Sequence, residues 1–487
     1  MARATWTTKD SSDLDLAIDA ARPLTRDEES ALRGVFEESD LPYAVDVVDM
    51  QTVSKTFRKI VERERVELSL GNMKDTMDHT TLAELAEILG GFAFKSGDFG
   101  DFGIPVVKIS AIEPPLIDIT KCEHILPEKA SGIERFKIIN GDMVMAMTGA
   151  TTGKVGRYRH SLFAFINQRV AKISAKAGKS TDDFIYAILT QPGFDQIVLS
   201  QAHGSAQPNI SSTDIGRITV PKFDYNIQAD IGSFIRALDD KIELNRCMNE
   251  TLESMARAIF KDWFVDFGPT RAKAEGRAPY LAPDLWSLFP ERLDDEGKPE
   301  GWSYVTFEQL VDAKQGKYLA KEDMSDIKSA EFLHPVWGGN GILGYSHKYT
   351  YSEPVTLITC RGSNCGLIKL TEYSACVSNN SFACLPKFGS TFFINIYFKM
   401  DTFDGCISGS AQPQITYTAL KNRIMQFPIH RDICESASAV IDPLFDKILR
   451  NNAETSQLAQ TRDYLLPKLM SGEIRIREAE KLVATAV

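Results

Sequence analysis

The chain has 487 residues, of which 43% are apolar and 25% are charged, a composition typical of a packed protein of about three domains. No apolar run approaches the ~20 residues that a membrane-spanning helix needs, so the sequence excludes that class of protein and favours a cytoplasmic location. Its eight Cys form no CxxC pair, which indicates reduced thiols and excludes the common zinc motifs.

Charge is distributed unevenly along the chain. Residues 1–78 hold 17 Asp and Glu against 11 Lys and Arg, whereas residues 80–222 and 302–430 are both close to neutral. The net charge of −11 therefore does not exclude a nucleic-acid partner, because a few cations on one face of a neutral domain can contact DNA. We expect the sequence-independent affinity for phosphate to be modest, so that a partner protein supplies much of the binding.

The first 70 residues contain two apolar, strand-like runs that carry acidic residues. Asp13 and Asp15 lie two positions apart in the first run, so a strand would turn both carboxylates to one face. Asp46 lies in the second run. Three such carboxylates are the ligands that a divalent cation prefers.

This segment resembles the small nucleotidyltransferase-like proteins of toxin–antitoxin pairs, and the match runs on through residues 41–68, LPYAVDVVDMQTVSKTFRKIVERERVEL. The resemblance implies a Gly-Ser turn before Arg3 that would cradle phosphate, but the sequence has Met1 and Ala2 there. We therefore expect a truncated remnant, inert or structural, that binds no metal and whose three carboxylates are vestiges of a metal site.

A heptapeptide occurs twice in the chain, as GSAQPNI at residues 204–210 and as GSAQPQI at residues 409–415. Each copy ends a domain-sized segment and precedes a long helical pattern. We infer a duplication, and we predict the following order: 1–70, nucleotidyltransferase-like segment; 80–224, first repeated domain; 225–268, central helix; 269–300, connector; 301–429, second repeated domain; 430–480, C-terminal helix.

Apolar residues at heptad spacing predict both long helices. Asn245 and Asn451 interrupt the apolar seam at equivalent positions, 206 residues apart. Because a polar seam residue fixes the register and the partner of a helix pair, we predict that the two helices pack on each other. The alternative is that each helix docks on its own domain. The predicted helix-pair and partner interface contains Ile235, Leu238, Ile242, Asn245, Leu252, Leu444, Ile448, Asn451 and Leu458.

We interpret GATTGKVG (149–156) as a tight turn and not a phosphate-binding loop, because its lysine is followed by Val155 instead of Ser or Thr. The turn would present its basic residues outward. Asn and Gln can pair with adenine and Arg with guanine. We therefore predict DNA contacts by Lys95, Lys154, Arg157, Asn167, Gln168 and Arg169. For each single side chain, simple solvation at the surface is the alternative.

The second domain repeats this plan with different side chains. CRGSNCG (360–366) takes the place of the first turn, and NNS (379–381) answers the pair NQ (167–168). The predicted DNA contacts here are Lys317, Lys348, Arg361, Asn379 and Asn380. A shared scaffold with different reading residues is the pattern expected if each copy recognises a different short sequence.

Several motifs follow one another along residues 80–475: GGFAFKSGDF, TGATTGKVG, GSAQP, PEGW, CRGSNCG, a second GSAQP and LLPKLMSGEI. On these motifs the chain resembles the specificity subunits of type I restriction-modification systems, the HsdS family. The resemblance implies an α+β fold of two globular α/β target-recognition domains, each binding one half of a split DNA site. Two long antiparallel conserved helices, forming an intrachain coiled coil, would separate the domains.

The same resemblance implies a non-catalytic subunit. Its partners would be double-stranded DNA, two methyltransferase subunits and restriction or motor subunits, with no membrane contact. No cofactor is expected in this chain, since S-adenosylmethionine, ATP and magnesium would belong to the partner subunits. Two other functions stay open: a nucleotidyltransferase-like antitoxin enzyme fused to a DNA-targeting module, and a protein-binding scaffold without a DNA role.

Overall fold

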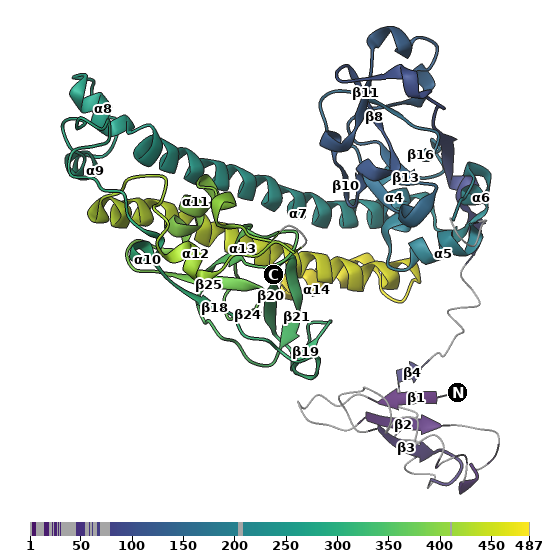
Figure 1. Ribbon diagram of the computed structural model, residues 1–487. Helices are drawn as coiled ribbons and strands as arrows, with labels where there is room; N and C mark the ends of the chain where they lie inside the picture. The colour runs from purple at the N-terminus through teal and green to yellow at the C-terminus, as the bar shows by residue number, and fades with distance from the viewer. Residues whose placement is uncertain are drawn as a thin grey trace. The chain divides into compact units, whose positions relative to one another are not determined.

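The computed structural model describes residues 78–202, 208–409 and 412–486 and, before residue 78, only residues 2–5, 14–18, 22, 24–26, 28, 30, 45–53, 58, 61 and 66–68. Contacts divide the chain into two compact units (Figure 1). The first unit joins residues 1–236 to residues 461–486, and the second comprises residues 237–460. Each unit therefore holds one α/β domain, the start of one long helix and the end of the other.

The first α/β domain is built on two mixed sheets. Its strands are β5 (His79–Thr81), β6 (Ala86–Gly90), β7 (Phe99–Gly100), β8 (Ile104–Val107), β9 (Ile112–Glu113), β10 (Leu116–Ile117), β11 (Glu123–Ile125), β12 (Lys137–Ile138), β13 (Met143–Ala146), β14 (Val155–Arg157), β15 (Ala164–Ile166), β16 (Val170–Ala175) and β17 (Thr219–Pro221). Its helices are α3 (Leu82–Leu85), α4 (Asp182–Thr190), α5 (Phe194–Gln201) and α6 (Ser212–Arg217). The strand orders are β6-β16-β13-β14-β10-β9 and β12-β15-β8-β11-β7, and β5 pairs with β17.

The second α/β domain has two sheets of four strands each, fewer strands than in the two sheets of the first domain. Its strands are β18 (Val311–Gln315), β19 (Met324–Ser325), β20 (His334–Gly338), β21 (Gly341–Ser346), β22 (Thr356–Thr359), β23 (Ile368–Leu370), β24 (Cys376–Val377) and β25 (Ser381–Pro386). Its helices are α10 (Phe307–Leu310), α11 (Thr391–Met400) and α12 (Tyr417–Lys421). The strand orders are β18-β25-β22-β23 and β19-β21-β20-β24.

Strand topology confirms the duplication. The antiparallel run β6-β16-β13-β14 recurs as β18-β25-β22-β23. The run β7-β11-β8-β15 recurs as β19-β21-β20-β24, and in both runs only the last pair is parallel. The helix that follows these sheets, α4 in the first domain and α11 in the second, begins at a hydroxyl N-cap in both copies. The Thr181 hydroxyl accepts from the backbone N–H of Phe184, and the Ser390 hydroxyl accepts from the backbone N–H of Phe393. Strands β9, β10 and β12 are additions to the first copy.

The two long helices are α7 (Tyr225–Phe260) and α13 (Arg431–Met470), followed in the chain by the short helices α8 (Gly268–Ala274), α9 (Pro283–Leu288) and α14 (Ile476–Ala486). In the first unit Ile231, near the start of α7, shares a core with Leu469, near the end of α13. In the second unit Phe260, at the end of α7, shares a core with Ala437, near the start of α13. Helices α7 and α13 are therefore antiparallel, as predicted, and each also closes the core of a domain.

A chain of amide side chains lies in the helix pair of the second unit. Asn245 and Asn451 are fully buried. The Asn245 amide donates to a carboxylate oxygen of Glu454 at 2.9 Å, and the Asn451 amide donates to Asn249 Oδ1 at 2.8 Å. Asn249 in turn donates to Asn452 Oδ1 at 2.8 Å. The bonds pair the side-chain N–H groups of Asn245 and Asn451 in this register, while the buried Oδ1 atom of each has no hydrogen-bond partner among the described residues. A different register would leave the N–H groups unpaired as well, so the amides favour this one.

Apolar seam residues surround these amides. Ile235, Leu238, Ile242 and Leu458 are buried, and Leu252, Leu444 and Ile448 are half-buried. The amphipathic heptad pattern therefore supplies the stability of the helix pair, while the amides supply its register.

The N-terminal segment is described only in part. Strands β1 (Ala2–Thr5), β2 (Leu14–Ile18), β3 (Val45–Asp49) and β4 (Val66–Leu68) form a sheet in the order β3-β2-β1-β4. Asp15 and Asp46 are Cα partners across the parallel strands β2 and β3, and Asp13 lies outside the described residues. Within the described part of the chain, no group of acidic, His or Cys residues fits a metal ion, and no helix has the length and apolarity to cross a bilayer.

The Asn245 amide yields a stability prediction. Asn245→Ala removes the donor to Glu454 from a buried site, so we expect a loss of about 1–3 kcal/mol, seen as a lower urea midpoint for the full chain. Gln460→Ala removes an exposed amide of α13 that takes no part in this chain of amides; it is the matched control and should cost less than about 0.5 kcal/mol. Equal losses in both variants would contradict a register-fixing role for the buried amide.

Candidate nucleic-acid interface

In the first domain the repeated peptide is hydrogen-bonded to the turn that follows β13. The amide of Gly149 donates to the Pro208 carbonyl at 3.0 Å, and the amide of Ile210 donates to the Met147 carbonyl at 3.0 Å. Residues 203–207 of this copy lie outside the described part of the chain. The side chain of Ile210 is buried, so the peptide is anchored by both its backbone and its apolar end.

The second copy makes the same contacts with the turn that follows β22. The Gly362 amide donates to the Pro413 carbonyl at 3.1 Å, and the Ile415 amide donates to the Cys360 carbonyl at 3.0 Å. Residues 410 and 411 are outside the described part. Arg361 therefore stands where the first copy has Thr148, which confirms that the two turns are equivalent.

The loops that precede β16 and β25 are also equivalent. The carbonyls of Arg169 and Asn380 accept hydrogen bonds from the first residue after β13 and after β22, at 2.9 Å and 2.8 Å. Gln168 therefore corresponds to Asn379, and Asn167 corresponds to Ser378. The sequence comparison, which matched Asn379, Asn380 and the next residue to Asn167 and Gln168, was out of register by about one position.

Two glycines explain how these loops are held. A Cβ atom on Gly91 would lie 2.3 Å from the Asn167 carbonyl oxygen, and one on Gly316 would lie 2.2 Å from the Val377 carbonyl oxygen. Any side chain at either position would push the loop away. The glycines of GGFAF and KQGK therefore set the position of the loop that carries the predicted reading residues.

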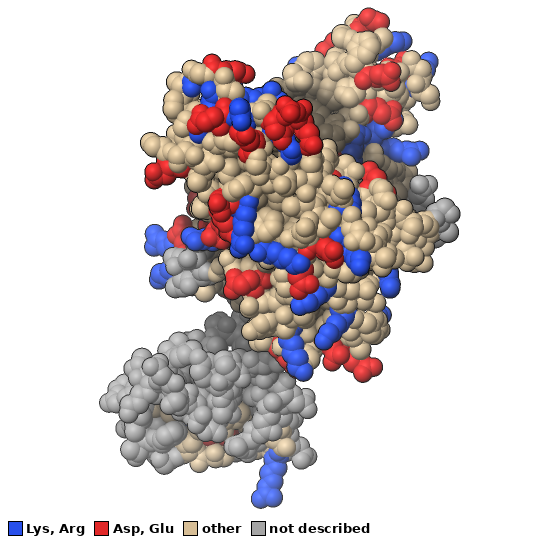
Figure 2. Space-filling model, turned by 60° about the vertical axis from the view of Figure 1, so that its left-hand side comes forward, with Lys and Arg blue, Asp and Glu red and all other residues tan. Residues whose placement is uncertain are grey.

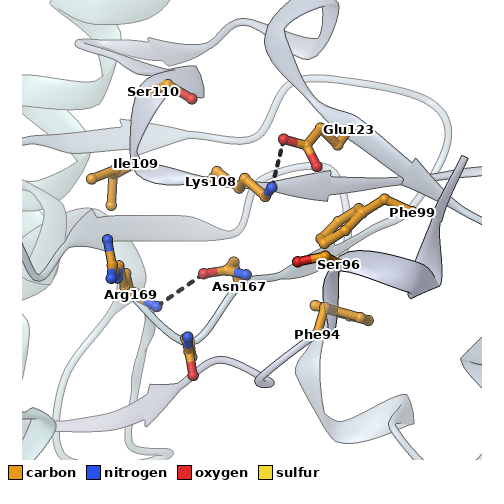
Figure 3. Close-up of a pocket in the computed structure, with 10 residues that line it drawn as sticks. Phe94, Ser96, Phe99, Lys108, Ile109, Ser110, Glu123, Asn167 and Arg169 are labelled. Atoms are coloured by element: carbon orange, nitrogen blue, oxygen red, sulfur yellow. Dashed lines mark hydrogen bonds and ion pairs between the residues drawn. The ribbon is translucent and has the colours of Figure 1, made fainter. Parts of the chain in front are cut away.

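In the first domain these loops border an open cleft of about 470 Å³ (Figure 3). Four chain segments line it: Phe94, Ser96, Phe99, Lys108, Ile109, Ser110, Glu123, Asn167, Gln168 and Arg169. Lys108 pairs with Glu123 at 2.5 Å, and its Nζ lies 4.0 Å from the centre of the Phe99 ring. The structure thus brings three predicted residues together and adds Lys108 and two aromatic rings that the sequence analysis missed.

The three predicted residues of the cleft differ in availability. Gln168 and Arg169 are exposed, and within the described residues their side chains have no hydrogen-bond or ion-pair partner. Asn167 is only 9% exposed, and its Oδ1 faces the Arg169 backbone amide at 3.4 Å (Figure 3). Gln168 and Arg169 are therefore the side chains that a bound molecule meets first, while Asn167 supports the loop.

The prediction that Arg157 faces outward was wrong. Its side chain is buried and pairs with Asp183 Oδ1 at 2.9 Å, with its guanidinium 4.0 Å from the centre of the Tyr186 ring. Asp183 also pairs with Arg236 on α7 at 3.1 Å. Arg157 belongs to an inner strand, β14, and not to the turn before it, so it joins the sheet to α4.

The two other predicted lysines of the first domain, Lys95 and Lys154, do not line this cleft. Lys95 is exposed, and its amide donates to an Asp98 carboxylate oxygen at 2.8 Å. This bond is the main reason why the pKa of Asp98 is lowered. Lys154 is exposed and lines a different cavity, of about 350 Å³, together with Pro115 and Arg462.

In the second domain four predicted residues lie at one sheet edge. Arg361 is exposed, and its side chain has no partner among the described residues. Gly339 lies beside both Arg361 and Asn380: a Cβ atom on this glycine would be 3.4 Å from the Arg361 carbonyl oxygen and 3.9 Å from Asn380 Cβ. Lys317 is exposed, and its backbone bridges to Ser378, directly before Asn379. Lys348 is exposed but follows β21, where its carbonyl accepts from the Cys376 thiol.

Neither chemistry nor charge marks this edge as a catalytic or metal site. Burial raises the pKa of the Cys360 and Cys365 thiols on either side of Arg361, which disfavours thiolate at neutral pH. Figure 2 shows basic and acidic side chains interspersed on the face in view, without a continuous basic patch. The unpaired amides and guanidinium groups are instead donors of the kind that base edges require.

Comparisons with known proteins agree with this description. Residues 74–254 and 299–459 match the family model of the type I restriction modification DNA specificity domain. The type I restriction enzyme MjaIX specificity subunit of Methanocaldococcus jannaschii is 21% identical over 446 residues, which cover 86% of this chain and 98% of that protein. The crystal structure of the type I restriction-modification S subunit from M. genitalium matches with a TM-score of 0.51 at 16% identity, covering 83% of this chain and 98% of that one.

The N-terminal segment has a separate relative. A stretch of 52 residues is 46% identical to the probable protein adenylyltransferase MntA of Haemophilus influenzae and covers 46% of that protein. The predicted resemblance of this segment to a nucleotidyltransferase-like protein is supported by this match to part of a protein adenylyltransferase.

The two family matches together cover well over half of the chain, and each contains one of the two repeated α/β domains. The chain therefore belongs to the type I restriction-modification DNA specificity family.

Proposed function

We propose that this chain is the subunit that selects the DNA target of a type I restriction-modification complex, with each α/β domain reading one half of a split site. One observation carries the proposal: corresponding backbone hydrogen bonds hold the turn and the loop in both copies, while the side chains at equivalent positions differ. Gln168 and Arg169 in the first copy are answered by Asn379 and Asn380 in the second. One scaffold with two sets of donors is what reading two different half-sites requires.

Base recognition would follow from the chemistry of these side chains. A guanidinium group pairs bidentately with guanine and a carboxamide with adenine in the major groove. Arg169 and Arg361 have no partner among the described residues, so neither has to break an ion pair before it binds. Lys154, Lys317, Lys348 and Lys95 would contact phosphates, and their small number explains why we expect weak binding without a partner.

The helix pair would recruit the catalytic subunits. Because α7 and α13 are related by the duplication, they present equivalent outer surfaces on which two copies of a methyltransferase subunit could dock. Exposed apolar residues occur on both helices, among them Leu244, Met255 and Tyr464. In this proposal restriction or motor subunits join the complex, and S-adenosylmethionine, ATP and magnesium are bound by the partners, so the chain itself is not an enzyme.

The alternative, a nucleotidyltransferase fused to a DNA-targeting module, has less support. The N-terminal match covers 46% of its relative and 11% of this chain. The repeated domains and the helix pair, in contrast, account for the rest of the chain.

The two domains should be separable by mutation. Arg361→Ala should relax recognition at one base position of one half-site, by about 1–3 kcal/mol, and Gln168→Ala should relax one position of the other half-site. The measurement is the methylated motif in genomic DNA of cells that carry each variant. Arg292→Ala, an exposed arginine of the connector, is the control and should leave the motif unchanged. Relaxation of both half-sites by either variant would show that these residues have a structural role.

Binding should depend on the methyltransferase partner. Since both domains are near neutral, the purified chain alone should bind cognate and scrambled duplexes weakly and alike, whereas the chain with its methyltransferase should prefer the cognate duplex. Fluorescence anisotropy at fixed salt distinguishes these cases. Tight, sequence-specific binding by the chain alone would contradict the prediction.

A further inference from the structure

Each reading edge contains a second exposed amide that the sequence analysis did not select. In the first domain Asn209 forms an antiparallel bridge with Thr148, and in the second Gln414 forms one with Arg361. The hydrogen bonds lie on either side of these pairs and not between them. In such non-hydrogen-bonded pairs the side chains stand closest together, on the same face of the ladder. Gln414 is therefore the direct neighbour of Arg361.

The backbone of both amide residues is fixed, and their side chains are free. The backbone N–H of Gln414 donates to the Ser408 carbonyl at 2.8 Å, and the backbone N–H of Ser408 donates to the Gln414 carbonyl at 2.9 Å. The next residue, Ile415, is buried. Asn209 likewise precedes a buried Ile210. Both carboxamides are exposed, and neither has a hydrogen-bond partner among the described residues.

Anchoring explains part of the repeated peptide but not these amides. The Pro carbonyl and the buried Ile hold the turn in both copies, whereas an exposed side chain adds nothing to that hold. The neighbouring positions Thr148 and Arg169 have diverged to Arg361 and Asn380, whereas a carboxamide is kept at Asn209 and Gln414, as it is at Gln168 and Asn379. Of these two pairs, only Asn209 and Gln414 lie in the peptide whose other six residues are identical in the two copies. A group kept within such a peptide is suited to a feature that the two half-sites have in common.

The sugar–phosphate backbone is the part of DNA that does not change between half-sites. Asn and Gln side chains commonly donate to phosphate oxygens, and such contacts orient a protein on the duplex without reading sequence. We propose that Asn209 and Gln414 are a matched pair of phosphate-binding residues, one in each domain, that set the orientation in which the adjacent reading residues meet the bases. This inference rests on the proposed function in DNA recognition.

The test uses the full chain in complex with its methyltransferase subunit. Asn209→Ala and Gln414→Ala should each weaken binding of the cognate duplex about tenfold, the loss expected for one hydrogen bond to a charged group, and should leave the methylated motif unchanged. Asn209→Gln and Gln414→Asn keep the carboxamide and should retain most of the affinity. Gln201→Ala, at the end of α5, and Asn422→Ala, directly after α12, remove exposed amides of the same domains; they are the matched controls and should bind as the unmodified complex does.

A methylphosphonate scan of the duplex locates the contact. In the unmodified complex one neutralised phosphate in each half-site should lower the affinity, and Asn209→Ala should abolish that sensitivity in one half-site only. Wild-type affinity of both alanine variants, or relaxation of a base position in the motif, would overturn the phosphate assignment. Failure of the unmodified complex to select any sequence would instead overturn the proposed function, so the two failures are distinguishable.

Discussion

The antiparallel packing of α7 on α13 is the constraint on which the rest of the structure depends. Each helix begins in the core of one unit and ends in the core of the other, so neither α/β domain has a complete core without both helices. The buried Asn245 and Asn451 amides permit one register of that packing. A slip by one heptad would strand these amides among apolar side chains and cost the full desolvation of each.

Within each domain, backbone hydrogen bonds and a buried isoleucine of the repeated peptide, Ile210 or Ile415, hold the reading edge. Gly91 and Gly316 allow the backbone of the loop before β16 and before β25 to approach closely. The repeated peptide is hydrogen-bonded to the turn after β13 in the first domain and after β22 in the second. Because these bonds involve main-chain atoms, the outward side chains can change without loss of the fold. The same division explains how a duplicated scaffold can acquire two specificities while keeping, at Asn209 and Gln414, a group of the same chemistry.

Much of this organisation could be predicted from repeated and periodic patterns in the sequence. The heptapeptide repeat, the heptad seam and the paired Asn residues predicted the duplication and the helix pair, because period and burial are tied to local geometry. Arg157 could not be placed, since whether a residue ends a turn or begins an inner strand depends on its sheet neighbours. The cleft at Lys108 and Phe99 was missed because it joins segments that only the tertiary fold brings together. The DNA contacts of the individual side chains stay predictions.

The central claim, that the helix pair holds two reading domains on one split DNA site, is tested most directly by shortening both helices together. Deleting residues 238–244 and 456–462 removes one heptad from facing stretches of the two helices and retains Asn245 and Asn451 with their hydrogen bonds. The deletion keeps the apolar seam in phase and shortens the pair by about 10 Å, or roughly three base pairs. The measurement is the methylated motif of the doubly deleted chain in complex with its partners. The account predicts unchanged half-site sequences separated by a shorter spacer. An unchanged spacer in a folded, active double deletion would contradict it.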